Sequence, residues 1–402
     1  MPKFRGLERL TPNLLPFLLA SLSLILSACA MDGPQSTLDT VAPVGEKQMW
    51  LLGYTAIISA FVLLGVGGVL FFALWRYRAK EGDDEIPAQT HGNTGVEIGL
   101  IVLATVITVI VIVPAVRINF ETGIRVEPEE NDVVVNVTGY QWWWAMDYIN
   151  EGFTTANEIH VPQGDHRLIL NLASADVLHS FWVPKLGGKM DLIPNQDNRL
   201  WLQIEADTPP GVYYGECAEL CLGAHAYMRF RVVVDTPEDY ETWLESFQSI
   251  PKLSPTTAAT AQTPEQFLQV QDIDLNSELV TQGEALFKTK GCAACHAVQG
   301  YAGGAVDKPN LTNFGLRHSL AAGVLDMPHD DAEKRRENLK RWLRDPQDVK
   351  PGNYMPTLWS FNTSELAEES EAEIAAVTEY LLSLGVESAS EPQASLGGNH
   401  GN

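Results

Sequence analysis

Residues 217–228, with the sequence CAELCLGAHAYM, carry four side chains that bind soft transition metals. Cys217 and Cys221 offer thiols, His225 an imidazole and Met228 a thioether. The two cysteines could instead form a disulfide in an exported segment, hold zinc with histidines, or act as a redox dithiol. Copper accounts for more of the residues, because a cupredoxin site combines Cys, two His and a weak Met ligand on a β-sandwich. A second cysteine on the loop would let two thiolates bridge two copper ions.

The elements that must position this loop are short strands. Between residues 131 and 235, β-branched and aromatic runs alternate with period two and are separated by Gly/Pro turns, which predicts an antiparallel sandwich or barrel. The runs are DVVVNVTG, HRLILNLA, RLWLQIEA, GVYYGE and MRFRVVVD. The loop joins the last two runs, and His179, in ADVLHSFWVP, is the candidate for the second imidazole from an earlier strand.

A second reactive group lies in GCAACHA. Cys292, Cys295 and His296 have the C-x-x-C-H spacing of covalently attached c-type haem, with the histidine under the iron. A zinc knuckle would need another Cys/His pair nearby, and a thioredoxin-like disulfide would need a βαβ context. Methionine is a common sixth ligand of electron-transfer haems. The candidates for that position are Met355 in KPGNYMPTL, Met327, His318 and His329.

Helical patterns surround the haem motif. Amphipathic or capped segments at 277–289, 331–346 and 364–385 predict an all-α domain. The preceding stretch, 249–264, is rich in Pro, Thr and Ala and is typical of a linker. The Gly/Ser/Asn-rich tail from 386 is expected to be disordered.

The N-terminal region predicts export and membrane insertion. Three basic residues, an apolar run and LSAC resemble a bacterial lipoprotein signal, which would be cleaved before Cys29 and lipidated there; the alternative is a first membrane helix with an incidental cysteine. Residues 50–75 and 97–117 are apolar runs of spanning length. The loop 76–96 begins with RYRAK, so the positive-inside rule places it in the cytoplasm and everything after the second span outside. A buried helical hairpin of a soluble protein would not need these lengths.

Composition limits the partners. The chain has 402 residues and a formal net charge of −24. An acidic protein of this kind is not expected to bind nucleic acid, whereas a basic protein partner is favoured.

Several motifs together resemble subunit II of bacterial haem–copper cytochrome c oxidases. They are DVLHSFWVPKLGGKMDLIPNQDNRLWLQ, GVYYGECAELC, GAHAYM and GYQWWW, and with the paired spans the resemblance covers nearly the whole chain. The fused haem domain further resembles the caa3-type variety. The chain departs from the family pattern at Trp143, where Tyr is frequent, and at Leu222, where Gly is usual. The resemblance therefore does not predict the loop conformation at Leu222.

The resemblance implies roles for individual residues. For the binuclear CuA centre it implies bridging thiolates at Cys217 and Cys221, one imidazole each from His179 and His225, and weak ligands from Met228 and the Glu219 carbonyl. The Glu219 side chain would reach a Mg²⁺ shared with subunit I. Trp142 would be the aromatic at which electrons enter CuA in members that lack a haem. Glu97 matches the carboxylate at the cytoplasmic mouth of a proton channel; an ionisable residue at a helix end can also simply snorkel to the interface.

The helical domain resembles class I cytochrome c. That family places its axial methionine before a proline, between the middle and C-terminal helices, which implies Met355 rather than Met327 as the ligand opposite His296. In KPNLTNFGLR, Pro309 would pack beside His296. Arg317 would either approach a haem propionate or be a solvated surface charge.

The expected protein is therefore the electron-entry subunit of a cytochrome c oxidase in a bacterial cell membrane. Electrons would pass from a soluble basic cytochrome c through haem c and CuA to subunit I, which reduces O₂ and pumps protons. The spans hold no histidine set for oxygen chemistry. A quinol oxidase subunit would lack the copper ligands, and a copper-delivery or redox-sensing protein would need neither haem nor spans.

The expected fold is a two-helix transmembrane hairpin, an all-β cupredoxin-like Greek-key sandwich and an all-α cytochrome c domain. The expected segments are a signal peptide at 1–28, an exported segment at 29–49, membrane helices at 50–75 and 97–117 around a cytoplasmic loop at 76–96, a CuA domain at 118–248, a linker at 249–264, a cytochrome c domain at 265–385 and a disordered tail at 386–402.

Overall fold

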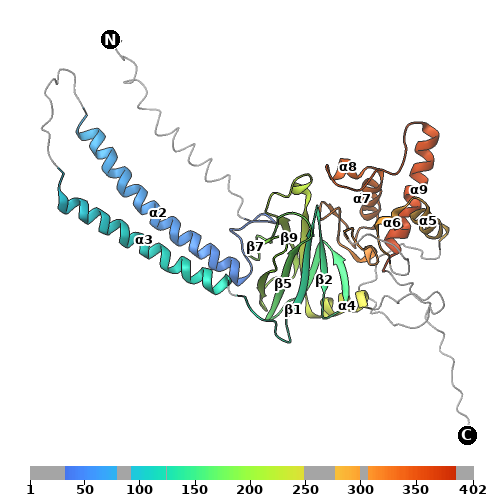
Figure 1. Cartoon of the computed structure of the whole chain (residues 1–402), viewed down its shortest axis with the longest axis horizontal. Helices are drawn as coiled ribbons and strands as arrows, with labels where there is room; N and C mark the ends of the chain where they lie inside the picture. Colours follow the sequence, from blue (N-terminus) through green and yellow to red (C-terminus); the bar gives the residue numbers. More distant parts are fainter. Residues whose placement is uncertain (1–31, 79–91, 124, 249–276, 299–306, 386–402) are drawn as a thin grey trace, which may run out of the picture.

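The computed structural model describes residues 32–78, 92–123, 125–248, 277–298 and 307–385. In chain order they form a long helical hairpin, a β-sandwich and a small helical domain, with the sandwich between the other two (Figure 1). These three parts confirm the fold class that the sequence predicts. The expected lipidation site, Cys29, and the linker at 249–264 lie outside the described residues.

The hairpin consists of α2 (Pro43–Arg76) and α3 (Thr94–Gly123), which run side by side away from the sandwich (Figure 1). Both helices are long and apolar enough to cross a membrane, and their large apolar side chains are exposed. Exposure of this kind suits lipid rather than water. Lys47 and Glu121, 3.1 Å apart, form an ion pair between the helix ends nearest the sandwich.

The sandwich is built from two five-stranded sheets. The first has the order β3-β2-β1-β5-β8, with bounds Phe153–Ala156, Trp143–Tyr148, Val133–Tyr140, His166–Ser174 and Asn198–Ile204. The second has the order β4-β10-β9-β6-β7, with bounds Glu158–Pro162, Arg229–Asp235, Gly211–Cys217, His179–Trp182 and Lys189–Leu192.

The expectation of a purely antiparallel sandwich is wrong for two strand pairs. β1 pairs with β5 in parallel, and β4 pairs with β10 in parallel. The chain leaves the first sheet after β3, enters the second as β4 and returns as β5. These neighbours are therefore joined by crossovers, and only strands joined by a tight hairpin must be antiparallel.

Aromatic side chains from both sheets fill the sandwich core. Trp144 packs edge-on against Phe181 and Phe230, with ring centroids 5.8 and 5.3 Å away, and all three are buried. In the second sheet Phe181 lies opposite Cys217. Because His179 begins the same strand as Phe181, this register brings His179 and Cys217 to one end of the core.

The remaining elements follow the sandwich. They are α4 (Pro237–Gln248), α5 (Glu278–Thr289), α6 (Cys292–Cys295), η2 (Phe314–Leu316), β11 (Ser319–Leu320), β12 (Leu325–Asp326), α7 (Ala332–Arg344), α8 (Pro346–Val349) and α9 (Ser364–Ser383). Ser277 caps α5 and Thr363 caps α9, each accepting a hydrogen bond from a backbone N–H of the first turn. A Cβ on Gly283 would lie 2.0 Å from the carbonyl oxygen of Ala376, so glycine lets α5 and α9 cross in close contact.

Candidate functional site

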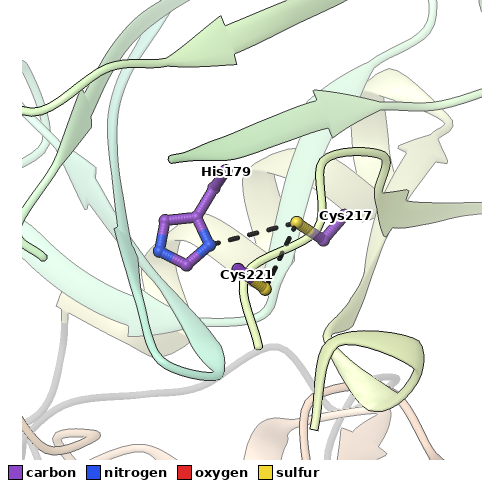
Figure 2. Close-up of side chains that lie close together, drawn as sticks. All are labelled: His179, Cys217 and Cys221. Atoms are coloured by element: carbon purple, nitrogen blue, oxygen red, sulfur yellow. Dashed lines mark hydrogen bonds between the residues drawn. The ribbon is translucent and has the colours of Figure 1, made fainter. Parts of the chain in front are cut away.

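The two cysteines of the 217–228 loop face a histidine at the end of the sandwich core. Cys217 Sγ lies 3.8 Å from Cys221 Sγ and 3.9 Å from His179 Nδ1, and the three side chains point toward one another (Figure 2). Cys217 ends β9, Cys221 lies on the following loop and His179 begins β6. All three are buried.

The other three expected donors converge on the same point. His225 Nδ1 lies 3.5 Å and Met228 Sδ 3.7 Å from Cys221 Sγ. The backbone carbonyl of Glu219 lies 3.2 Å from Cys217 Sγ. The structure thus brings together two sulfurs, two Nδ1 atoms, a thioether and a carbonyl from one loop and one neighbouring strand.

The geometry separates the competing interpretations of this loop. A disulfide needs sulfurs about 2.05 Å apart, so Cys217 and Cys221 are free thiols in this structure. Structural zinc sites use four Cys, His or carboxylate ligands and have no use for a thioether. The set of soft sulfurs and imidazoles fits copper, which accepts a long thioether bond.

Asp176, which the sequence argument did not select, orients one ligand. Its carboxylate Oδ1 lies 2.7 Å from His179 Nε2, which leaves Nδ1 directed at Cys217. A carboxylate on the far nitrogen is the usual partner of a metal-bound histidine. The only sequence signal was an aspartate three positions before the histidine in ADVLH.

The two thiols share their protons unequally. The hydrogen bond with Cys221 is the main cause that holds the pKa of Cys217 well below that of a free thiol, and His179 adds to it. The resulting thiolate raises the pKa of Cys221. A positively charged metal between the sulfurs would favour the thiolate form of both.

The loop after Cys221 adopts a conformation that side chains rarely take. Leu222, exposed on the surface, has φ of 68°, a left-handed backbone conformation that favours glycine. Gly223 is required sterically, because a Cβ would lie 2.2 Å from the Trp142 ring. The loop therefore has a left-handed backbone conformation at Leu222, even though this residue is not glycine.

Trp142 contacts both this loop and the helical domain. Its indole Nε1 donates to the carbonyl of Cys221 at 2.8 Å, and Gln141 Nε2 donates to the same oxygen at 2.9 Å. Trp142 is only 6% exposed: it belongs to the sandwich core, and Tyr354 and Lys350 of the helical domain also contact it. A protein docking from solvent would not reach this indole directly.

The C-x-x-C-H motif opens into a largely apolar cavity of about 180 Å³ between the domains. Cys292, Cys295, His296 and Met355 line it, and Trp142 forms part of the opposite wall. The Pro309 carbonyl lies 3.0 Å from His296 Nδ1. This contact fixes the ring so that Nε2 is the free nitrogen, and burial lowers the pKa of His296, which favours the neutral ligand form.

The candidates for the sixth haem ligand lie in different parts of the structure. Met355 lines the cavity, whereas Met327 is fully buried in the core of the helical domain. His318 and His329 stack on each other with centroids 4.1 Å apart, and His318 contacts Glu158 of the sandwich. The cavity lining combines two thiols, an imidazole and a thioether, and this set of donors fits a covalent haem.

Arg317 is not a solvated surface charge. It is 4% exposed, lines the cavity and donates to the carbonyl of Asn310. Burial lowers its pKa to about 10. A buried guanidinium facing the cavity suits a carboxylate group of a bound haem.

The helical domain is held on the sandwich by several direct bonds. The Arg229 N–H donates to the Ala322 carbonyl at 3.0 Å, and the Trp143 indole donates to the Asp307 carbonyl at 3.2 Å. Lys350 is 3% exposed and its Nζ lies 2.5 Å from the Trp142 carbonyl. Burial lowers the pKa of Lys350 to about 7.

A buried charged cluster lies at the same interface. His160 Nε2 is 2.9 Å from Glu158 and its Nδ1 is 2.7 Å from Asp235, and its ring stacks on Trp243 of α4. Glu158 also accepts from the backbone N–H of His318 at 3.1 Å. Glu158 and His160 lie on the same strand, but Asp235 and His318 come from distant segments, so sequence analysis could not predict this cluster.

The structure does not bring two of the expected residues to a site. Glu97 is exposed in the first turn of α3, and the Glu219 side chain is partly exposed beside the copper loop. Their expected partners belong to another subunit or to a channel, so both assignments stay predictions.

Known families match along the chain. The transmembrane domain of cytochrome c oxidase subunit II matches residues 34–118, its periplasmic domain matches 133–236, and cytochrome c matches 280–385. The periplasmic domain of subunit II of cytochrome oxidase from Bradyrhizobium japonicum, a crystal structure, is 29% identical, covers 30% of this chain and 96% of that chain, and has a TM-score of 0.28.

Relatives match this chain over almost their whole length. Cytochrome c oxidase subunit 2 of Alkalihalophilus pseudofirmus is 37% identical, covering 92% of this chain and 96% of the relative. The protein of the same name from Bacillus subtilis is 33% identical, covering 92% and 97%. The chain therefore belongs to the cytochrome c oxidase subunit II family and carries a cytochrome c domain at its C-terminus.

Proposed function

We propose that the chain is the electron-entry subunit of a caa3-type cytochrome c oxidase. Bound CuA and covalent haem c would each supply one-electron redox chemistry, and O₂ would be reduced, with proton pumping, in subunit I. Cys217, Cys221, His179, His225, Met228 and the Glu219 carbonyl would hold the copper ions; Cys292, Cys295, His296 and Met355 would hold the haem.

One observation carries this proposal. Trp142 forms a wall of the cavity that holds the C-x-x-C-H motif, and its indole donates to the carbonyl of Cys221. A single buried side chain thus contacts both candidate redox sites. Two domains with unrelated functions would not be expected to share a buried side chain that contacts both of their binding sites.

The chain's own residues bury the candidate copper site and fix its donors. The thiols and His179 are buried, Asp176 fixes the imidazole, and Gly223 allows the loop to lie on Trp142. Ligands that keep their positions need little rearrangement when charge changes, which favours rapid electron transfer.

The surroundings proposed for the subunit follow from its charge and its spans. The two exported domains would lie outside the bacterial inner membrane, where a soluble basic cytochrome c would be attracted by the acidic chain. Glu219 would contribute to a Mg²⁺ site shared with subunit I. Glu97 would serve the cytoplasmic mouth of a proton channel, and Cys29 would be lipidated.

The copper assignment is tested by Cys217→Ser in the purified full-length protein. One thiolate cannot bridge two copper ions symmetrically, so the mixed-valence copper signal should be lost. Electron paramagnetic resonance and the visible spectrum measure this, and unchanged haem c bands are the control for folding. A seven-line copper pattern that persists in the variant would contradict the proposal.

A wild-type spectrum separates the rival functions. Haem c bands with mixed-valence copper bands are expected. A quinol oxidase subunit would show no CuA bands, and a copper-delivery protein would show no haem c bands.

A further inference from the structure

Tyr354 links the two candidate sites through ring contact. It immediately precedes Met355, the residue placed to bind the haem iron, and its ring centroid lies 4.8 Å from that of Trp142 at an interplanar angle of 31°. Trp142 in turn donates to the Cys221 carbonyl at 2.8 Å. Covalent bonds, one ring contact and one hydrogen bond thus connect Met355 to Cys221.

A second connection between Tyr354 and the Cys221 carbonyl consists of hydrogen bonds through Gln141. The Tyr354 hydroxyl lies 3.4 Å from Gln141 Oε1, and Gln141 Nε2 donates to the Cys221 carbonyl at 2.9 Å. The first of these bonds is long, so the ring contact is the stronger part of the connection.

The segment that carries Tyr354 is held in place on both sides. Asn353 donates to the Lys350 carbonyl at 2.7 Å and accepts from the Met355 N–H at 2.7 Å. Gly352 has φ of 85°, and a Cβ there would lie 3.3 Å from the backbone of Gly223. The haem-side segment therefore lies directly against the copper loop.

Hydrophobic burial does not explain why the Tyr354 ring lies against Trp142. The residue is 62% exposed, so it contributes little to either hydrophobic core. An exposed aromatic ring held against a buried indole suggests a role in coupling rather than in folding.

We propose that Tyr354 is the relay residue between the haem pocket and Trp142; this inference rests on the proposed function. When bound, haem c would supply the one-electron donor and the copper pair the one-electron acceptor, so the electron balance would close between these two groups. Tyr354 and Trp142 provide electronic overlap along the way. Neither ring is itself oxidised, and no proton moves.

The test compares Tyr354→Leu with Tyr354→Phe in the full chain within the assembled oxidase. After an electron is injected at haem c, the haem band and the CuA band report its transfer. Leucine should slow the transfer several-fold, because the ring contact is lost. Phenylalanine should slow it much less, since only the long hydroxyl bond disappears. Phe361→Leu, which removes an exposed ring from the same segment, is the matched control and should leave the rate unchanged.

A second readout excludes a merely structural role. The Arg229 amide bonds to Ala322 across the domain interface, so its hydrogen exchange in the copper-free protein reports docking. Unchanged exchange with slowed transfer in Tyr354→Leu supports the relay. Wild-type transfer rates in Tyr354→Leu, or slowed transfer accompanied by faster Arg229 exchange, would overturn it. Absence of the CuA or haem c bands in wild type would instead refute the proposed function.

Discussion

Met355 and Met327 are predicted to have different tasks, because Met355 lines the cavity and Met327 is fully buried in the core of the helical domain. Met355→Ala should abolish the weak sulfur-to-iron band and lower the haem potential, because thioether ligation raises it. Met327→Ala should leave the band in place and destabilise the domain by about 2–5 kcal/mol, since it empties a fully buried core position. Near-infrared absorption, redox titration and thermal unfolding distinguish the variants, and exchanged phenotypes would show that the ligand is misassigned.

His160 makes stability depend on pH. Burial alone would lower its pKa, but Asp235 and Glu158 outweigh burial and raise it to about 9, from 6.5 in the unfolded chain. The protonated imidazole therefore stabilises the fold by about 3 kcal/mol below pH 6.5, and this contribution disappears as pH rises through 9. The melting temperature of His160→Gln should lie furthest below wild type near pH 6 and approach it above pH 9. A difference independent of pH would contradict the ion-pair account.

At the residue scale the sequence singled out side chains that the structure brings to one point, but it did not identify the residues that hold them there. Cys217, Cys221, His225 and Met228 lie within twelve residues, so their types and spacing alone indicated copper. Asp176 acts only because the fold turns its carboxylate onto His179. An aspartate three positions before a histidine does not by itself show that the two side chains meet.

That limit applies most strongly to contacts between the domains. Tyr354 and Lys350 contact Trp142, which lies about two hundred positions earlier in the chain. Nothing in the composition of either segment indicates this partner, and the linker pattern suggested a freely hanging domain. The buried interface arises from complementary shapes that appear only after both domains have folded.

At the scale of elements, periodicity predicted strands and helices, but not how they pair. The sandwich follows from alternating runs, yet the parallel pairing of β1 with β5 depends on crossovers between sheets. Helix ends were predictable where side chains cap them, as Ser277 does for α5. The short strand β7 was not predicted, because four residues contain too little period-two signal.

The crossing of α5 and α9 gives a prediction at this scale. Gly283→Ala would force a methyl group against the Ala376 carbonyl, which should destabilise the haem domain by about 1–3 kcal/mol and reduce haem attachment. Covalent haem content and thermal unfolding measure the effect, while the CuA spectrum should stay unchanged. Thr281→Ala, at an exposed position of α5, is the matched control. If Gly283→Ala folds and takes up haem like the control, close helix packing is not what requires glycine.

At the scale of the whole molecule, the covered Trp142 decides between two routes of entry. A soluble donor that passes electrons directly to Trp142 must reach the indole from solvent. Here the indole is only 6% exposed, and residues of the helical domain contact it. We therefore predict that the helical domain, rather than Trp142, is the surface at which a donor docks. Removing the domain would uncover Trp142 and create a route that the intact protein lacks, so the intact oxidase is the proper test.

The most direct measurement mixes the intact oxidase with a reduced basic cytochrome c and follows the haem c and CuA bands in time. Haem c should be reduced first and CuA afterwards, with a bimolecular rate that falls as salt rises, because the chain carries a net charge of −24. Reduction of CuA before haem c would contradict entry through the haem domain.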